Sequence, residues 1–123
     1  MANSNRKIML VDDNIISTMV TVDVLRQHGY DVVQTTSPNG CIAKVDYEEP
    51  DVLLVDIDMP RLAFDDIVRS VQTDSTHSEL MFVLFSNRPP RELDTLCNSK
   101  DLHGYFSKKM DVTRLPEYLG YFF

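Results

Sequence analysis

Five short runs with the length and composition of β-strands alternate with longer segments along this 123-residue chain. The runs cover residues 7–11, 31–35, 51–56, 80–85 and 104–107. Several of them are almost continuously apolar, which is typical of strands that are buried on both faces of a sheet. Strands that alternate with helices form a parallel sheet with helices on both sides. The alternation therefore predicts one α/β domain over residues 1–123, without internal repeats or a linker.

The segments between the runs carry the boundary signals of helices. Asn14 is suited to cap a first helix, and Gly29 is suited to end it. We expect the buried face of this helix to consist of its apolar residues, which are Ile15, Ile16, Met19, Val20, Val22 and Leu25. A second helix is expected over residues 37–49, because Ser37 and Pro38 have the pattern of an N-cap and a first helical residue.

The remaining helices are expected over residues 64–71, from Pro89 onward and from about Asp111 onward. Pro116 is tolerated in the last helix only near its start, because proline cannot donate the helical hydrogen bond. This helix would be short and would end in an apolar terminus of Tyr118, Leu119, Tyr121, Phe122 and Phe123. We expect the terminus to pack onto the domain; a patch for a partner protein is the alternative.

Polar side chains stand where the runs end. Asp12 and Asp13 follow the first run, and Asp56 closes the third. Ser86 follows the fourth run, and Lys108 follows the fifth. In an open parallel sheet, ligands bind in the crevice at the carboxyl ends of the strands. The pattern therefore gathers three carboxylates, a hydroxyl and an ammonium group, a combination that suits a divalent cation and a phosphoryl group.

Composition and charge argue against several classes of protein. The net charge of −7 argues against direct nucleic-acid binding, which needs clustered Lys and Arg. Cys41 and Cys97 lack the spacing of a zinc site, and we interpret them as reduced packing residues, although spacing alone does not exclude a disulfide. No apolar stretch approaches the roughly 18 residues of a membrane span. Residues 1–7 also lack the apolar core of a signal peptide, so we expect a cytoplasmic protein.

The chain resembles a response-regulator receiver domain of the CheY-like kind over essentially its whole length. The resemblance rests on four motifs in order, Val11-Asp12-Asp13, Val55-Asp56-Ile57-Asp58-Met59-Pro60, Leu84-Phe85-Ser86 and Tyr105-Phe106-Ser107-Lys108. Each motif alone is weak, but all four at strand ends form a specific signal. The resemblance implies a flavodoxin-like sheet with the strand order 2-1-3-4-5. It also implies that Asp56 accepts a phosphoryl group from the phosphohistidine of a histidine kinase or phosphotransfer protein.

The same resemblance implies Mg²⁺ as the cofactor. Asp13 and Asp56 would supply carboxylate ligands, and the backbone carbonyl of Asp58 would be a third protein ligand. Asp12 would help to hold the ion through water. The simpler interpretation of Asp12 and Asp13 is that their charges only favour the start of the following helix.

Three further residues would act once the phosphoryl group is present. Lys108 would pair with Asp56 in the empty site and would later contact a phosphoryl oxygen. Ser86 would donate its hydroxyl to another phosphoryl oxygen. Tyr105 would rotate between exposed and buried positions as a switch residue. Taken singly, Lys108, Ser86 and Tyr105 are better explained as a solvated charge, a turn residue and a core aromatic. Only their combination at one edge of the sheet favours the functional interpretation.

The sequence departs from the family pattern at two positions. Phe64 stands where the family usually has Gly, so we expect a different course for the loop before it. Lys109 stands where the family has a proline, and in the family the peptide bond before this proline is cis. A cis bond before a residue other than proline costs roughly 3–4 kcal/mol, so we predict a trans bond between Lys108 and Lys109. Asp58 and Arg88 occupy positions that tune the lifetime of the phosphoryl group in the family. An ion pair between them would hinder an attacking water; the simpler interpretation is an exposed pair that contributes little.

These features support three hypotheses. The first is a phosphorylation-switched signalling module that binds a downstream protein partner or passes the phosphoryl group on, as in a phosphorelay. It would not be an enzyme with an external substrate, and homodimer formation stays open. The second is a scaffold that works without phosphorylation, which the departures at Phe64 and Lys109 keep open. The third is a small Mg²⁺-dependent phosphatase, with Asp56 as nucleophile and Asp58 as acid and base.

Overall fold

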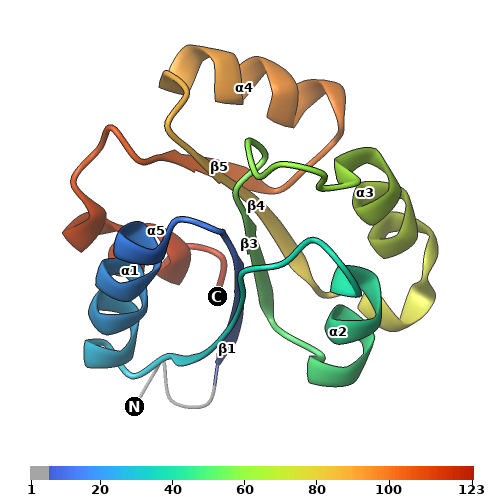
Figure 1. The fold of residues 1–123 in the computed structure, drawn as a ribbon, viewed down its shortest axis with the longest axis horizontal. Coiled ribbons are helices and arrows are strands. Elements are labelled where there is room, and N and C mark those ends of the chain that lie inside the picture. Colours follow the sequence, from blue (N-terminus) through green and yellow to red (C-terminus); the bar gives the residue numbers. More distant parts are fainter. Residues whose placement is uncertain (1–5) are drawn as a thin grey trace.

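The computed structural model describes residues 6–123. Its centre is a five-stranded parallel sheet in the order β2-β1-β3-β4-β5 (Figure 1). The strands are β1 (Lys7–Val11), β2 (Asp31–Thr35), β3 (Val52–Val55), β4 (Met81–Ser86) and β5 (Gly104–Ser107). The predicted α/β fold with its flavodoxin-like strand order is confirmed, and the strand boundaries agree with the prediction to within one residue.

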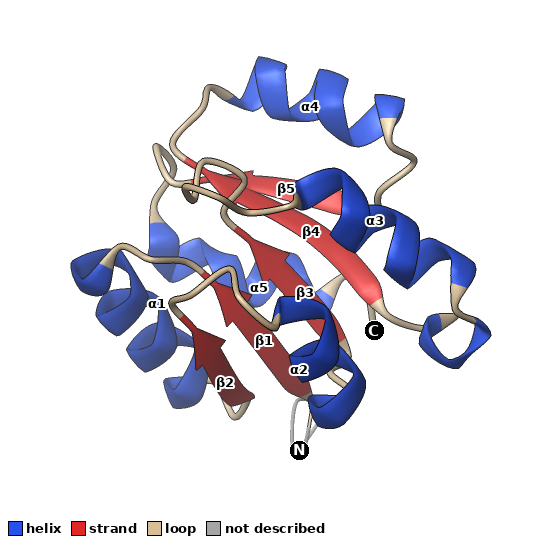
Figure 2. Cartoon of the chain, turned by 45° about the vertical axis from the view of Figure 1, so that its right-hand side comes forward, coloured by secondary structure: helices blue, strands red, loops and turns tan. Residues whose placement is uncertain are grey.

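Helices cover both faces of this sheet (Figure 2). One face carries α1 (Ile15–Gln27) and α5 (Leu115–Gly120). The other face carries α2 (Cys41–Glu48), α3 (Phe64–Thr73) and α4 (Pro90–Ser99). Two short 3₁₀ turns, η1 (Ser75–His77) and η2 (Val112–Arg114), precede β4 and α5.

The sheet separates two apolar cores, because successive side chains of a strand point to opposite faces. In β1, Met9 and Val11 belong to the core beneath α2 and α3. Ile8 and Leu10 belong to the core beneath α1 and α5. All four side chains are fully buried. Burial on both faces explains why the central strands are continuously apolar in the sequence.

The register of the strands brings the polar residues at their ends together. β1 and β3 are in register at Val11 and Val55. The residues that follow, Asp12 and Asp56, therefore leave the sheet at the same level. β4 extends to Ser86, where it still pairs with β5. The crevice predicted from the sequence thus lies above the carboxyl ends of β1, β3, β4 and β5.

The second helix begins later than predicted. α2 starts at Cys41, after Gly40, which has a left-handed conformation with a φ of 71°. Ser37 does not cap a helix, because its side-chain oxygen accepts a hydrogen bond from the backbone N–H of Asn39. This local turn is one that serine commonly forms, and it competes with helix capping. The helix ends at Glu48, one residue before the predicted end.

The apolar residues of α1 are divided between core and solvent. Asn14 caps the helix as predicted and accepts from the backbone N–H of Ser17 at 2.9 Å. The buried residues are Thr18, Thr21, Val22 and Leu25. Four others are between 46% and 76% exposed, namely Ile15, Ile16, Met19 and Val20. The prediction of a single buried face is therefore wrong for these four, because two threonines occupy positions that face the core.

The C-terminal segment packs onto the domain, as predicted. α5 contains Pro116 in its first turn, where the missing N–H costs no helical hydrogen bond. The ring centroids of Phe106 and Tyr118 are 5.8 Å apart, and those of Tyr118 and Phe122 are 5.5 Å apart. These rings extend the core beneath α5. Tyr121 is 80% exposed and takes no part in this packing.

Three further sequence predictions concern the class of protein. Within residues 6–123, no helix is both long enough and apolar enough to cross a membrane. Cys41 and Cys97 are buried and free, so they form no disulfide. The signal-peptide prediction concerned residues 1–7, and residues 1–5 of these lie outside the described part of the chain.

Candidate functional site: an acidic pocket with a buried lysine

Three aspartates meet at the carboxyl ends of β1 and β3, where the sequence analysis placed them. One carboxylate oxygen of each of Asp12, Asp13 and Asp56 lies within 4.8 Å of the others. Asp12 is fully buried and Asp56 nearly so, whereas Asp13 is exposed. The carboxylate of Asp12 accepts from the backbone N–H of Asn14 at 2.9 Å and from the hydroxyl of Ser17 at 3.3 Å. The pocket therefore offers an oxygen-only donor set, the kind that Mg²⁺ prefers.

Lys108 supplies the positive charge of this pocket. Its Nζ lies 2.6 Å from Oδ2 of Asp12 and 3.1 Å from Oδ2 of Asp56. It also lies 5.0 Å from the centroid of the Phe85 ring. The predicted pairing with Asp56 is confirmed. The shorter bond to Asp12 was missed, because Asp12 and Asp13 are neighbours in sequence and only the turn after β1 decides which of them points inward.

Burial raises the pKa of Asp56 above the ordinary aspartate value, because the ionised carboxylate loses hydration. The backbone N–H of Asp58, which donates to Oδ1 of Asp56 at 2.9 Å, opposes this rise, and so does Lys108. The negative charge of Asp12 raises the pKa further. A bound cation would favour the ionised form of Asp56 for the same reason as Lys108 does.

The side chain of Asp58 is held by Ser86 and Arg88, and we call these three residues the Asp58 cluster. The Ser86 hydroxyl donates to Oδ2 of Asp58 at 2.6 Å. Nε and Nη2 of Arg88 lie 3.0 Å and 2.9 Å from Oδ1 of Asp58. Burial raises the pKa of Asp58, but the hydrogen bonds from Ser86 and Arg88 outweigh burial, so the pKa is lowered. The predicted ion pair between Asp58 and Arg88 is confirmed.

The Asp58 cluster bears on two other sequence predictions. Asp58 was predicted to bind the metal through its backbone carbonyl, and this stays a prediction. The side chain of Asp58 contacts Ser86 and Arg88. The Ser86 hydroxyl, predicted to bind a phosphoryl oxygen, is used here by Asp58. The backbone N–H of Arg88 also donates to Oγ of Ser86, at 3.1 Å. A movement of the Ser86 hydroxyl would therefore alter the hydrogen bonding of the loop that follows β4.

Tyr105 lies in β5 and is half-buried against the core beneath α2 and α3, to which α4 also contributes. Burial raises the pKa of its hydroxyl, and Asp94 of α4 raises it further. The backbone N–H of Tyr105 donates to the hydroxyl of Tyr118 at 3.0 Å. A side chain from α5 therefore accepts a hydrogen bond from the outer edge of β5, where no further strand pairs within residues 6–123. The sequence pattern gave no signal for this contact of Tyr118. The switch role of Tyr105 stays a prediction.

The two departures from the family pattern are accommodated in the loops around the pocket. Phe64 begins α3 and packs edge-on against Phe82, with ring centroids 6.0 Å apart. The left-handed residue of the loop before it is Arg61, with a φ of 63°, so no glycine is required at position 64. Within residues 6–123 every peptide bond is trans, including the predicted one before Lys109. The N–H of Lys109 donates to Oγ of Ser107 at 3.2 Å, a bond that proline could not make.

The fold and this pocket define a class of protein: a parallel α/β domain with strand-end aspartates and a buried lysine in one crevice. Residues 8–120 match the family model described as the response regulator receiver domain. The chain belongs to this family of two-component signalling modules. Receiver domains are signalling modules and in general not metabolic enzymes.

Known proteins agree with this assignment. Protein PilH of Pseudomonas aeruginosa is 26% identical over 110 residues, which cover 89% of this chain and 90% of that protein. The structure of the chemotaxis response regulator CheY4 of Vibrio cholerae matches with a TM-score of 0.84 at 20% identity, covering 98% of this chain and 100% of that one. The receiver domain of the sensor histidine kinase PA1611 of Pseudomonas aeruginosa matches with a TM-score of 0.79 at 20% identity, covering 97% and 98%. At these identities the two structures show the fold alone.

Proposed function

We propose that this receiver domain accepts a phosphoryl group on Asp56 from the phosphohistidine of a kinase or phosphotransfer protein. One observation carries the proposal: Asp12, Asp13 and Asp56 present oxygens within 4.8 Å of one another, beside Nζ of Lys108. The oxygen-only donor set fits Mg²⁺. The PA1611 receiver domain is itself described with a magnesium ion coordinated in its active-site cleft.

In this proposal Asp13 and Asp56 hold the ion directly, the carbonyl of Asp58 is a third ligand, and Asp12 supports the ion through water. When bound, Mg²⁺ supplies positive charge that offsets the repulsion between a carboxylate and an anionic phosphoryl group. A carboxylate oxygen of Asp56 attacks the phosphorus, the bond from phosphorus to the donor nitrogen breaks, and an acyl phosphate forms.

Lys108 and Ser86 would then hold the phosphoryl group. Nζ of Lys108 lies 3.1 Å from Asp56, beside the carboxylate that would carry the phosphoryl group. The Ser86 hydroxyl would have to leave Asp58, to which it now donates at 2.6 Å. This exchange would loosen the Asp58 cluster, and it would couple phosphorylation to the loop after β4 and to Tyr105.

The exposed apolar residues of α1 suggest where the phosphoryl donor docks. Ile16 and Val20 line one hollow together with Phe85 and Lys108, so the apolar surface reaches the edge of the pocket. A contiguous exposed apolar surface commonly marks a protein interface. We therefore assign the phosphoryl donor to the surface of α1.

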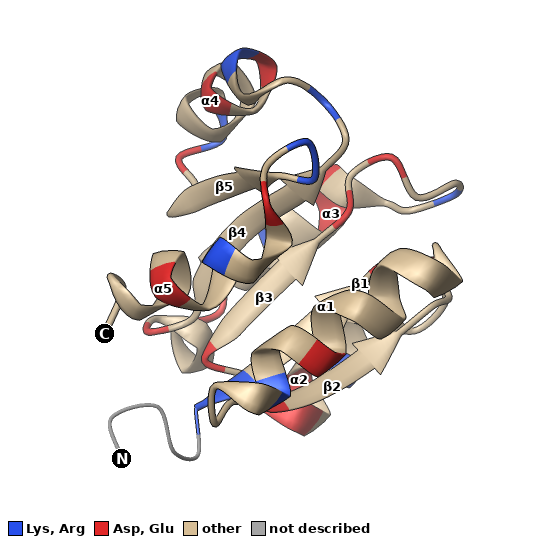
Figure 3. Ribbon diagram, turned by 90° about the vertical axis from the view of Figure 1, so that its left-hand side faces the viewer, with Lys and Arg blue, Asp and Glu red and all other residues tan. Residues whose placement is uncertain are grey.

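Charge and thiol chemistry bear on the other partners and on location. On the face shown in Figure 3, acidic and basic positions are interspersed over the described residues, and the chain carries a net charge of −7. We expect no direct nucleic-acid partner, because phosphate binding needs clustered positive charge. The two free, buried cysteines fit a reducing compartment such as the cytoplasm. Self-association stays an open expectation.

The Asp58 cluster argues against the phosphatase hypothesis. A general acid works best with a pKa near the working pH. The pKa of Asp58 is instead lowered, and both of its carboxylate oxygens are engaged by Ser86 and Arg88. The phosphorylation-independent scaffold stays the second candidate, since the Ser86 hydroxyl is committed to Asp58.

The test is self-phosphorylation by a small phosphodonor. The protein is incubated with Mg²⁺ and acetyl phosphate, and its intact mass is measured beside Asp56→Ala and beside Asp66→Ala, which changes an exposed aspartate of α3. We expect a gain of one phosphoryl group in the unchanged protein and in Asp66→Ala, and none in Asp56→Ala. No gain in any protein, also with a histidine phosphodonor, would favour the scaffold. Continuous turnover of p-nitrophenyl phosphate would favour the phosphatase.

A further inference from the structure

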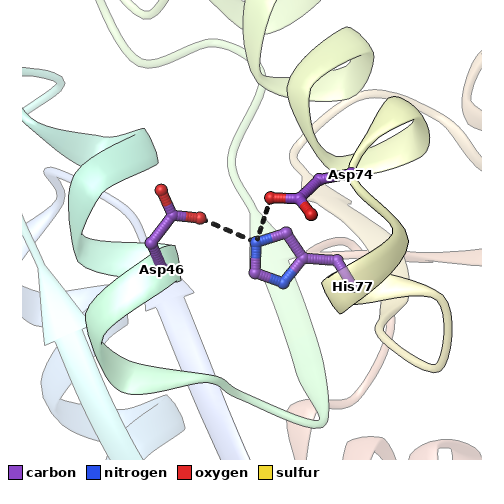
Figure 4. A group of neighbouring side chains, drawn as sticks. All are labelled: Asp46, Asp74 and His77. Carbon is purple, nitrogen blue, oxygen red and sulfur yellow. Dashed lines mark hydrogen bonds and ion pairs between the residues drawn. The ribbon is translucent and has the colours of Figure 1, made fainter.

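A second group of metal-ligating side chains lies outside the acidic pocket and consists of Asp46, Asp74 and His77 (Figure 4). Asp46 lies in the second half of α2, whereas Asp74 caps η1 and His77 is part of η1. One ligand atom of each residue lies within 4.8 Å of the others. Because η1 precedes β4, this group lies at the opposite end of the sheet from Asp56. We call it the His77 cluster.

The imidazole of His77 is the centre of the cluster. Its side chain is only 7% exposed, and Nε2 faces both carboxylates (Figure 4). Nε2 lies 2.7 Å from Oδ1 of Asp46 and 3.7 Å from Oδ2 of Asp74. Zinc binds histidine nitrogen and carboxylate oxygen at about 2.0–2.2 Å, which in a tetrahedron separates neighbouring ligands by about 3.3–3.6 Å. The two observed separations lie on either side of this range, so the direct contact between His77 and Asp46 would have to lengthen to admit an ion.

The surroundings favour a cation at this place. Oδ1 of Asp74 accepts from the N–H and the hydroxyl of Thr76 at 2.9 Å and 2.7 Å, which leaves Oδ2 on the side of His77. The same hydrogen bonds lower the pKa of Asp74, so its carboxylate is ionised. Glu49 and Glu79 line a hollow that His77 also borders. Acidic groups around a hollow raise the local concentration of cations.

We propose that the His77 cluster binds a transition-metal ion of the zinc class, with water completing the coordination. Donor chemistry separates this site from the acidic pocket. One imidazole nitrogen and two carboxylates suit Zn²⁺, whereas the oxygen-only set of Asp12, Asp13 and Asp56 suits Mg²⁺. A bound ion would tie α2 to the segment before β4. It would stabilise the folded chain by an amount that grows with the logarithm of the ratio between its free concentration and its dissociation constant.

The test uses the untagged full chain with Asp13→Asn, so that the acidic pocket is weakened and does not dominate cation binding. Zn²⁺ affinity is measured by calorimetry at mildly alkaline pH. Co²⁺ binding is followed at the same pH by its visible absorption, because metal ions compete with protons for their ligands. We expect one ion per chain and a thermal midpoint that rises with Zn²⁺ and not with Mg²⁺. A Co²⁺ spectrum of four-coordinate type should accompany binding.

Matched variants locate the ion. In the same background, Asp46→Asn and Asp74→Asn should each weaken Zn²⁺ binding by at least about tenfold, a loss that even outer-shell changes cause at metal sites. His28→Gln, which changes a histidine outside the cluster, should leave the affinity unchanged. Both asparagine replacements keep the size of exposed side chains, so folding is retained and circular dichroism checks it. Equal affinity in all three variants overturns the proposal. The absence of Zn²⁺ binding also overturns it and would leave the cluster as a hydrogen-bonded group of side chains.

Discussion

Replacing Lys108 by methionine should leave two buried carboxylates without their shared cation. Nζ of Lys108 lies 2.6 Å from Asp12, which is fully buried, and 3.1 Å from Asp56, which is 8% exposed. Removing one partner of a buried ion pair typically costs about 3–5 kcal/mol, because the remaining charge stays desolvated. Methionine keeps an apolar side chain of similar length but removes the ammonium group, including its position over the Phe85 ring, so the loss reports on charge. We expect a loss of about 3 kcal/mol, at the lower end because Asp56 can bind a proton.

The assay is urea unfolding followed by circular dichroism, with Lys109→Met as the matched control because Lys109 is the exposed neighbour. With a denaturant dependence of about 1–3 kcal/mol per molar urea, the midpoint of Lys108→Met should fall by about 1–3 M. The control should change the free energy of unfolding by no more than about 0.5 kcal/mol.

The pH dependence follows from the sign of the pKa shift. Loss of Lys108 raises the pKa of Asp56 in the folded state further above its unfolded value, so the folded state binds a proton more readily. The difference in the free energy of unfolding between Lys108→Met and the unchanged protein should therefore become smaller as the pH falls through the pKa of Asp56 in the folded variant. Mg²⁺ should reduce this difference as well, because it replaces the lost charge. Equal losses in Lys108→Met and Lys109→Met, or a difference that does not change with pH, would refute this reasoning.

Three further predictions follow from the contacts of the Asp58 cluster and of β5. Asp58→Ala and Arg88→Ala should each speed the loss of the phosphoryl group from Asp56 by about fivefold, which corresponds to about 1 kcal/mol of barrier; intact-mass decay measures this, and unchanged rates would remove the gate. Asp58→Asn should cost about 1 kcal/mol at neutral pH, a value reduced because the Asp58 side chain is 43% exposed. Since the pKa of Asp58 is lowered in the folded state, its stabilising contribution is present above the ordinary aspartate pKa of about 3.9 and is lost as the pH falls through the folded pKa. Urea unfolding at several pH values across this range checks the prediction. A difference in the free energy of unfolding between Asp58→Asn and the unchanged protein that persists in acid would contradict it. Tyr118→Phe removes the acceptor of the Tyr105 N–H and should cost about 1 kcal/mol, with faster hydrogen exchange at the Tyr105 amide; unchanged exchange there would contradict the contact.

Local patterns in the sequence determined the α/β class and the members of the acidic pocket, whereas the strand order was implied by the resemblance to receiver domains. Continuous apolar runs identify strands that are buried on both faces, and the polar residue that ends each run marks the crevice of a parallel sheet. Asp12, Asp56, Ser86 and Lys108 could be named in this way, because Ser86 is the last residue of its strand and the other three directly follow theirs. The trans bond before Lys109 was equally accessible, since the cost of a cis bond is a property of the residue type.

Only the tertiary structure decided which group contacts which. The sequence could not distinguish Asp12 from Asp13, and it assigned to the core four apolar residues of α1 that the structure exposes. It gave no sign that Ser86 would donate to Asp58, or that Asp46 and His77, which are 31 residues apart, would meet. A repeating pattern of residues reports the average direction of a helix face or strand face. Pairing of individual atoms depends on the turns after β1 and β3 and on how the helices pack, and these are fixed only when the whole chain is folded.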